Sequence, residues 1–295
     1  TVSGRRRGRV FQVSKKPSNA AIFLVSFLTY LIGIFPSMVF ALPTGGTVQA
    51  GSATINQPSS QQMTIQQTTE KAIIDWQKFG IGSAEQVDFQ LSQGGVTLNR
   101  VTGDDVSNIF GKLTSNGDLW LINPNGIFFG ANSQVDVHGL LATTSDISNA
   151  DFLSSNYNFG IPSSLSSTVV NQGSITAAEG GLVALVAPGV QNMGIITARL
   201  GKVSLASGKT FTVDLYGDQL INLGVDSQVM SQVMGMDGEA LSSLVTNSGS
   251  IFADGGVVRM DVNAAQGIVD RVINMDGVIQ AHSVSEQNGT IILSG

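Results

Sequence analysis

A short phrase of alternating residues recurs in the second half of the chain and limits what the chain can fold into. The phrase is Asn-x-Gly-x-Ile-x-Ala, and a turn and a second short apolar run follow each copy. Copies start at Asn171, Asn192 and Asn247, and a looser copy with one extra residue starts at Asn274. The starts are 21, 55 and about 27 residues apart, which suits a repeated unit of roughly twenty to thirty residues with one enlarged copy.

Alternation within a strand indicates that one of its faces is buried, and a single two-strand unit cannot bury that face alone. Copies stacked in parallel bury it, and they pair every backbone group with the coil above and below. Glycine is expected to supply positive φ at the corners. Asparagine can hydrogen-bond to its own turn or stack in ladders along the solenoid. An antiparallel sandwich also has short strands and glycine turns, but it does not predict a recurring phrase.

The expected fold is therefore all-β, a right-handed parallel β-helix with an N-terminal cap and excursions from its wall. The composition agrees, since 35 glycines and 12% charged residues are typical of short strands and tight turns. The interval 206–246 breaks the rhythm. Residues 211–225 predict a β-hairpin with its turn at Gly217-Asp218. Residues 228–245 predict a short helix or a loop, with their Met and Val side chains packed in a core rather than forming a cofactor site.

The first 41 residues have the pattern of an export signal. A basic region is followed by an apolar run from Ala20 to Phe35 and by small residues at Val39 and Ala41, which suit the −3 and −1 positions of a signal-peptidase site. We expect cleavage between Ala41 and Leu42. Residues 1–41 are then the signal peptide, and residues 42–295 are a β-helix domain that continues beyond this sequence. The alternative is a membrane anchor over residues 20–40, since an anchor needs about 20 apolar residues.

Removal of residues 1–41 changes the charge balance of the chain. It leaves nine basic residues against 21 acidic ones, a net charge near −12. Nucleic acid is thus not an expected partner, because phosphate binding needs a basic surface. The absence of cysteine excludes a disulfide framework and thiolate metal sites.

Asn123-Pro124-Asn125-Gly126 interrupts two apolar runs and has the residue order of a β-turn. Residues 118–123 and 126–130 are expected to be adjacent sides of one coil, joined by this turn as a corner. Residues 134–144 are expected to form the next side.

Residues 119–144, "LWLINPNGIFFGANSQVDVHGLLATT", also resemble the signature of a known family. This family is the N-terminal secretion domain, often called the haemagglutination activity domain, of two-partner-secretion exoproteins of the filamentous-haemagglutinin type. "WQKFGIGSAEQVDF" at 76–89, "LNRVTGDDVSNIFGKLTSNGDLWLINPNG" at 98–126, "SNYNFGIP" and "VVNQGSIT" are similar to further family segments in the same order. The resemblance covers Leu42 to about Gly295.

The resemblance implies a secretion domain of a large surface protein from a Gram-negative bacterium. Such a protein crosses the inner membrane through the Sec machinery, loses its signal peptide and reaches the cell surface or medium through the periplasm. The implied partner is a dedicated outer-membrane β-barrel transporter with periplasmic domains, and a host-surface carbohydrate or protein is a further candidate. The family motifs that serve transporter recognition or folding correspond to Asn99, Arg100, Val101, Asn123, Pro124, Asn125 and Gly126.

We find no sequence pattern for catalysis, a metal or a cofactor. The two histidines, His138 and His282, have no partner at metal-ligand spacing, and no P-loop, G-x-S-x-G or G-x-G-x-x-G motif is present. We therefore do not expect an enzyme. The alternative is a β-helix that binds polysaccharide, or a polysaccharide lyase or hydrolase, which would need clustered carboxylates or basic residues on one face.

Overall fold

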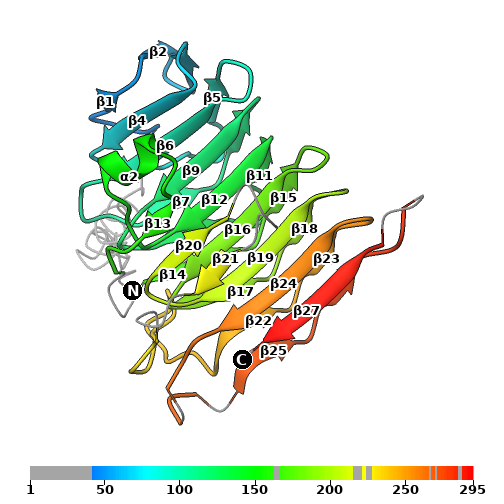
Figure 1. The fold of residues 1–295 in the computed structure, drawn as a ribbon. Helices are drawn as coiled ribbons and strands as arrows, with labels where there is room; N and C mark the ends of the chain where they lie inside the picture. The colour runs from blue at the N-terminus through cyan, green and yellow to red at the C-terminus, as the bar shows by residue number, and fades with distance from the viewer. Residues whose placement is uncertain are drawn as a thin grey trace, which may run out of the picture. The chain divides into compact units, whose positions relative to one another are not determined.

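The computed structural model describes residues 42–162, 167–214, 221–223, 228–265, 267–269, 271–284 and 288–294. Nearly all elements within them are β-strands, and strands of successive coils lie side by side in three long sheets (Figure 1). We call these sheets I, II and III, in the order in which each coil passes through them. The structure confirms the predicted parallel β-helix.

The bounds of the strands follow the order of each sheet. Sheet I contains β1 (Thr47–Ala50), β4 (Lys71–Trp76), β6 (Val96–Val101), β9 (Asp118–Ile122), β12 (Gly139–Thr143), β16 (Leu182–Ala187), β19 (Lys202–Ser207), β24 (Val257–Val262) and β27 (Thr290–Ser294). Sheet II contains β7 (Ser107–Ile109), β10 (Ile127–Phe129), β14 (Thr168–Asn171), β17 (Gly189–Asn192), β22 (Ser243–Asn247) and β25 (Arg271–Met275). Sheet III contains β2 (Ala53–Ser59), β3 (Gln62–Gln67), β5 (Gln86–Gln90), β8 (Lys112–Ser115), β11 (Gln134–Val137), β15 (Ser174–Ala177), β18 (Ile195–Thr197), β23 (Ser250–Phe252) and β26 (Val278–Gln280).

Antiparallel strands form the expected N-terminal cap. β1 pairs antiparallel with β4 and β2 pairs antiparallel with β3, whereas the other described pairs within the three sheets are parallel. β2 is the edge of sheet III and contains Pro58, which cannot donate a backbone hydrogen bond. A proline on an edge strand hinders the pairing of a further strand.

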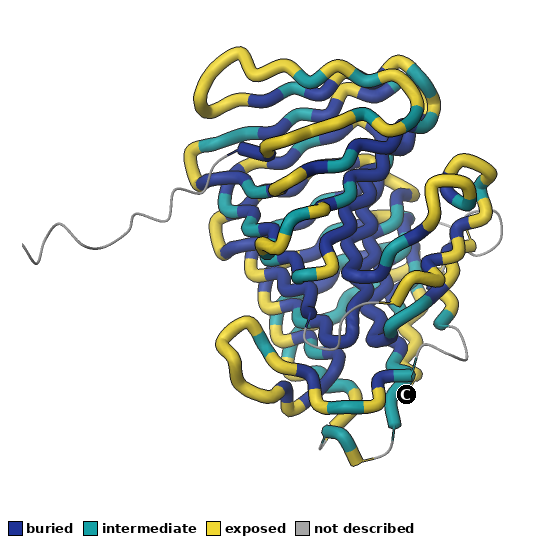
Figure 2. The backbone as a smooth tube through the Cα atoms, turned by 90° about the vertical axis from the view of Figure 1, so that its left-hand side faces the viewer, coloured by how far each residue is buried: buried dark blue, intermediate teal, exposed yellow. Residues whose placement is uncertain are grey.

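Side chains that alternate along the strands fill the interior of the coils. Inward positions such as Leu119, Leu121, Val135 and Ile175 are buried, and buried residues follow the stack from coil to coil in Figure 2. At 20 to 33 cal/mol per Å² of apolar surface removed from water, this burial is the main stabilising contribution. The alternation rule thus holds for the inner face of each sheet.

The recurring asparagine forms an internal ladder at the corner between sheets II and III. The Nδ2 of Asn171 donates to the Oδ1 of Asn192 at 2.8 Å, and the Nδ2 of Asn192 donates to the Oδ1 of Asn247 at 2.6 Å. The extra residue in the loose fourth copy places Met275, not Asn274, beside Asn247. The ladder therefore joins three coils, and Asn274 instead donates to Asp276.

Glycine at the corners has the expected positive φ at some positions, but the glycine of the phrase is required for space. A Cβ on Gly194 would collide with the carbonyl oxygen of Gly173, and one on Gly249 would collide with that of Gly194. Positive φ occurs at the next corner instead, at Gly180 and Gly255. Glycine at the first corner lets the backbones of successive coils approach closely.

Two excursions cover the outer face of sheet I, as Figure 1 shows. They comprise α2 (Asn149–Leu153), β13 (Asn158–Phe159), β20 (Phe211–Val213) and β21 (Ile221–Leu223), which we call the cover. β20 and β21 confirm the predicted hairpin, whose expected turn at Gly217-Asp218 lies outside the described residues. β13 joins them as a third antiparallel strand, a pairing that the sequence did not predict.

The cover creates a second apolar core between itself and sheet I. Trp120 points outward from β9 but is only 3% exposed, because its ring packs on Phe152, Tyr157 and Phe159. Phe159 stacks on Phe211 of the hairpin, with ring centroids 4.4 Å apart. Sheet I is therefore buried on a second face as well as on the inner face that the alternation predicted.

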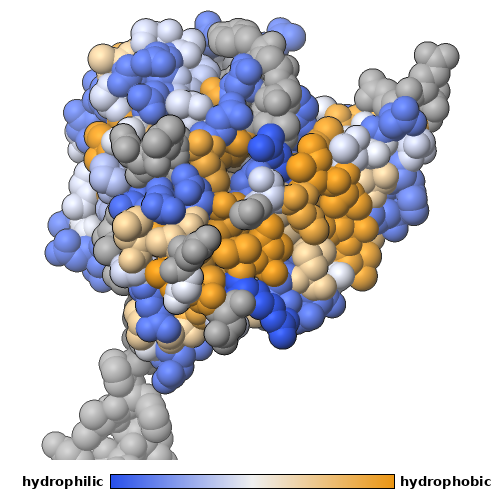
Figure 3. All heavy atoms as spheres, turned by 60° about the horizontal axis from the view of Figure 1, so that its bottom comes forward, coloured by the Kyte–Doolittle hydropathy of each residue, from blue (hydrophilic) through white to orange (hydrophobic). Residues whose placement is uncertain are grey.

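The third excursion is a loop and contains no helix within its described residues 228–241. Val229, Val233 and Leu241 pack with Leu244 of β22 in a small buried cluster, as expected. The methionines behave differently, since Met236 is 43% exposed. Exposed apolar side chains also occur in the last coil, which the view of Figure 3 brings forward, at Val272, Val278, Ile291, Ile292 and Leu293.

Candidate functional site

The Asn-Pro-Asn-Gly segment forms the predicted corner between β9 in sheet I and β10 in sheet II. The backbone N–H of Gly126 donates to the carbonyl oxygen of Asn123 at 3.1 Å, which closes the turn. Gly126 has a φ of +114°, a conformation that side-chain-bearing residues rarely adopt. The sequence prediction of a structural turn is confirmed.

The next side was predicted wrongly as one strand. Residues 134–144 form two strands, β11 in sheet III and β12 in sheet I, with His138 at the corner between them. The run of apolar and small residues after His138 belongs to β12, whose two faces are both buried. A strand buried on both faces loses the alternation on which the prediction relied.

The Asn123 side chain is buried and makes all its contacts within the protein. Its Nδ2 donates to the carbonyl oxygen of Asp105 and to the Oγ of Ser107, both at 2.9 Å. Its Oδ1 accepts from the backbone N–H of Asn125 at 2.9 Å. The side chain therefore joins its own turn to the coil below.

Asn125 adds a second bond to the same lower coil. Its Nδ2 donates to the carbonyl oxygen of Gly103 at 2.8 Å and to Asn123 Oδ1 at 3.2 Å. Pro124 is exposed and Gly126 is buried, so Pro124 presents the most accessible surface of the four residues. The corner is fixed by bonds to residues 103–107, the segment that directly follows the Asn-Arg-Val motif.

Asn99 and Val101 of that motif point into the coil interior. The Asn99 side chain is buried, and its Oδ1 accepts from Trp76 Nε1 at 2.9 Å. Val101 packs in the main core. A buried indole N–H needs a partner, so Asn99 lets the large Trp76 ring remain inside.

Arg100 points outward and fixes the start of the cover. Its Nε donates to both carboxylate oxygens of Asp146 at 2.9 Å, and its Nη2 donates to the Ile147 carbonyl oxygen at 2.7 Å. Its Nη1 donates to Asp75 at 3.1 Å and to Asn149 at 3.0 Å. The Arg100 side chain is only 14% exposed, so these bonds are partly shielded from water.

Lys71 fixes the other end of the same excursion, and sequence reasoning missed it. Its Nζ donates to the carbonyl oxygens of Phe152 and Leu153, at the C-terminal end of α2, and to Ser155 Oγ at 2.6 Å. The ammonium also lies 5.1 Å from the centre of the Tyr157 ring. The uninterrupted apolar run of β9 was a signal for such a cover, because it indicates burial on both faces.

The two described histidines each form a surface pair with an aspartate. His138 Nδ1 lies 2.7 Å from Asp118, and His282 Nδ1 lies 3.5 Å from Asp254. The hydrogen bond from the His282 backbone N–H lowers the pKa of Asp254. Within the part of the chain that the structure describes, no three His, Cys, Asp or Glu side chains are placed to hold a metal ion.

Leu42, the residue after the expected cleavage site, is buried in the main core. Ala41 and the rest of the expected signal peptide, residues 1–41, lie outside the described residues. None of the helices described here is long and apolar enough to cross a membrane.

Comparison with known proteins identifies relatives over most of the chain. The family model named TPS secretion domain matches residues 40–295. Two proteins named Heme/hemopexin-binding protein from Haemophilus influenzae, one of them from strain Rd, are each 33% identical. These matches cover 83% and 92% of this chain, but only 27% and 29% of the relatives. The chain thus spans less than a third of their length.

A solved structure shares the fold over a similar extent. The crystal structure of the HMW1 secretion domain from Haemophilus influenzae superposes with a TM-score of 0.69 and 31% identity. The match covers 85% of this chain and 62% of that one.

Proposed function

Because this chain belongs to the family of TPS secretion domains, we propose that it directs a longer surface protein to a dedicated outer-membrane transporter. The chain is a secretion domain of the exported, adhesin-like type. The observation that carries the proposal is the family match, which runs through every coil from residue 40 to residue 295. The partner is a β-barrel transporter with periplasmic domains.

The route to that transporter passes through the Sec machinery and the periplasm. The basic and apolar pattern of residues 1–41 supports this route, and signal peptidase would cut between Ala41 and Leu42. Leu42 is already part of the buried core, so the folded domain starts directly after the proposed cleavage site. The protein then reaches the medium or the cell surface.

Six of the seven motif residues, all except the exposed Pro124, act in folding rather than by direct contact with the transporter. Four of them are buried in the folded domain: Asn99, Val101, Asn123 and Gly126. The Arg100 side chain is hydrogen-bonded to Asp146 at the start of the cover. The motif residues lie in the first coils, where a solenoid can nucleate and then propagate coil by coil. Coils that have folded outside the cell cannot slip back through a transporter, so folding would favour export.

The activity of the whole protein lies outside this domain. The relatives are named for binding heme and hemopexin, and they are more than three times as long as the matched region. The two histidines described here, which could be considered as heme ligands, are instead each paired with an aspartate at a coil corner. We therefore propose a host-surface carbohydrate or protein as the target of the longer protein.

The alternative of a polysaccharide lyase or hydrolase has less support. A glycosidase of the common type needs two carboxyl groups facing each other across a substrate cleft. Three described acidic residues have shifted pKa values: Asp151, Asp254 and Asp261. A local hydrogen bond explains the lowered pKa of Asp151 and of Asp254, and burial explains the raised pKa of Asp261. A depolymerisation assay on acidic polysaccharides separates this alternative from the secretion domain.

The test is export by a transporter from the same locus. Residues 1–295 are produced with the transporter, with a transporter lacking its periplasmic domains, and with none, and the chain in the medium is measured beside a periplasmic marker. We expect release only with the intact transporter. Equal release in all three strains would contradict the proposal.

A further inference from the structure

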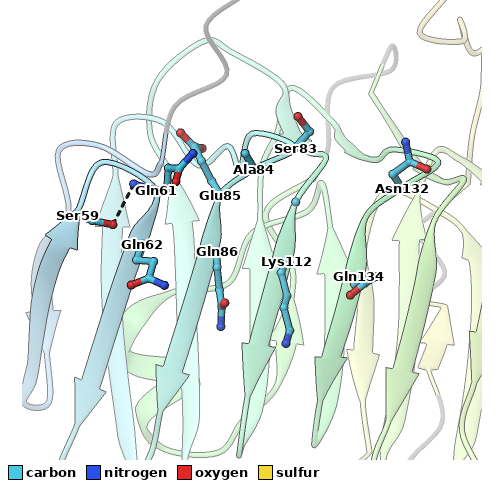
Figure 4. A pocket seen from close by; sticks show the side chains of 11 residues that line it. Ser59, Gln61, Gln62, Ser83, Ala84, Glu85, Gln86, Lys112, Asn132 and Gln134 are labelled. Carbon is cyan, nitrogen blue, oxygen red and sulfur yellow. Dashed lines mark hydrogen bonds between the residues drawn. The ribbon is translucent and has the colours of Figure 1, made fainter.

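The outer face of sheet III differs from the outer faces of the other two sheets. The cover lies on sheet I, and the 228–241 loop packs against sheet II through Leu244. At the start of β3, β5, β8 and β11, by contrast, sheet III carries an open groove of about 450 Å³ (Figure 4). Nothing in the secretion function accounts for it.

A row of long polar side chains forms the floor of this groove. Gln62, Gln86, Lys112 and Gln134 occupy matched register positions on four neighbouring strands. Neighbouring strands are about 4.8 Å apart, so the row spans roughly 14 Å along the solenoid. Figure 4 shows the four side chains in sequence below the border of the groove, which is formed by the end of β2 and by loops and contributes Ser59, Gln61, Ser83, Ala84, Glu85 and Asn132.

The hydrogen-bonding groups of this row are available, whereas those of the next row are partly occupied. Two residues further along the strands, Asp88 accepts a hydrogen bond from Thr114 and, at 2.9 Å, one from Gln90, which lies four residues beyond Gln86. Gln66 in turn donates to Gln90 at 3.4 Å. Among the described residues, no hydrogen bond or ion pair engages the side chains of the floor row.

The row also has a defined end. The next matched positions on sheet III are Ser174, Ile195, Ser250 and Val278, which are short or apolar. The amide-bearing surface is therefore confined to four coils, where the border loops also occur. If these long polar side chains only kept the outer face of the sheet in contact with water, we would not expect them to end at the border of the groove.

The chemistry of the groove excludes several ligands. Its strands are paired on both sides, so no backbone edge is free to add a peptide strand. Its lining is mainly polar, which disfavours lipids and most apolar small molecules. Lys112 and Glu85 give it one charge of each sign, which disfavours nucleic acid and strongly acidic polymers.

Each glutamine amide offers two donors and an acceptor, and a sugar hydroxyl also both donates and accepts. We propose that the groove binds a neutral glycan, which runs along the solenoid across Gln62, Gln86, Lys112 and Gln134. The row has no aromatic platform, so a single site binds weakly. Many copies on one surface would raise the overall avidity.

The exported chain is first tested for binding to a panel of immobilised neutral and acidic oligosaccharides. The oligosaccharide that binds best is then titrated into the chain, and the side-chain amide signals of the glutamines are followed by NMR. The variant Gln86→Ala/Lys112→Ala removes the centre of the row. The matched control Gln66→Ala/Gln90→Ala removes two paired glutamines that lie four residues further along β3 and β5 of the same sheet.

We expect a neutral glycan to shift the amide signals of Gln62, Gln86 and Gln134. We expect the groove variant to lose at least about tenfold in affinity and the control to stay within about twofold. Absence of binding across the panel, binding of acidic glycans alone, or equal loss in both variants would overturn the proposal. Export is measured separately, so failure of glycan binding leaves the secretion function untouched.

Discussion

Replacement of Asn123 by alanine should destabilise the first coils more than any exposed change at the same corner. Alanine removes three hydrogen bonds of 2.9 Å, to Asp105, Ser107 and Asn125, from a fully buried side chain. Each bond contributes about 0.5–1.5 kcal/mol net, and buried partners left unsatisfied cost more. We therefore expect the free energy of unfolding to fall by about 3 kcal/mol, a large part of the roughly 5–15 kcal/mol typical of domains.

Guanidinium unfolding of the exported chain, followed by tryptophan fluorescence, measures this loss. Both tryptophans, Trp76 and Trp120, are buried in the first coils and report on the region concerned. Pro124→Ala is the matched control, because Pro124 is exposed and its replacement should cost less than about 1 kcal/mol through the unfolded chain. Equal unfolding midpoints for the two variants would refute the reasoning.

Three further changes test other parts of the structure. Arg100→Met should lower the free energy of unfolding by about 3 kcal/mol and speed hydrogen exchange in α2, because Asp146 loses its ion-pair partner. Unchanged hydrogen exchange would contradict the role of Arg100 in fixing the cover. Gly194→Ala should cost about 1–3 kcal/mol in the same unfolding assay, because its Cβ would meet the Gly173 carbonyl oxygen; a neutral result would show that the coils can separate. Burial raises the pKa of Asp261, so the folded chain keeps this proton at a pH where the unfolded chain has lost it. The free energy of unfolding should therefore fall as the pH rises from the ordinary aspartate pKa through the raised one. Thermal melting should show this fall in the wild type and a flatter profile in Asp261→Asn, and parallel profiles would contradict it.

Much of the solenoid is predictable because its repeat is local. The Asn-x-Gly-x-Ile-x-Ala phrase places one asparagine and one glycine at the same corner of successive coils, and the ladder from Asn171 to Asn247 follows from that spacing. The role of glycine was less predictable. Close approach and positive φ both favour glycine, and only the positions of neighbouring backbones decide between them.

The hairpin of the cover was predicted, but its pairing with β13 and its packing on sheet I were not, because these contacts join segments far apart in the chain. β13 pairs with β20 across about fifty residues, and neither strand carries a local mark of its partner. Continuous apolar runs such as "LVALVA" in β16 are typical of strands buried on both faces, but such a run does not show which segment covers the second face.

The candidate site was predicted as a turn but not as a network. The residue order of Asn123 to Gly126 is sufficient to indicate the corner. The partners of its side chains lie in the preceding coil, and the main partner of Arg100 lies 46 residues further along the chain. Such pairs depend on coil register, which one sequence does not reveal.

The most direct test of the account compares export with stability in one set of variants. Transporter-dependent release and free energy of unfolding are both measured for Asn99→Ala, Arg100→Met, Asn123→Ala and Pro124→Ala. If the motifs act through folding, release falls in proportion to lost stability, and Pro124→Ala is released like the wild type. A variant with wild-type stability that is not released, or a strongly destabilised one that is fully released, would show that these motifs do not act through folding.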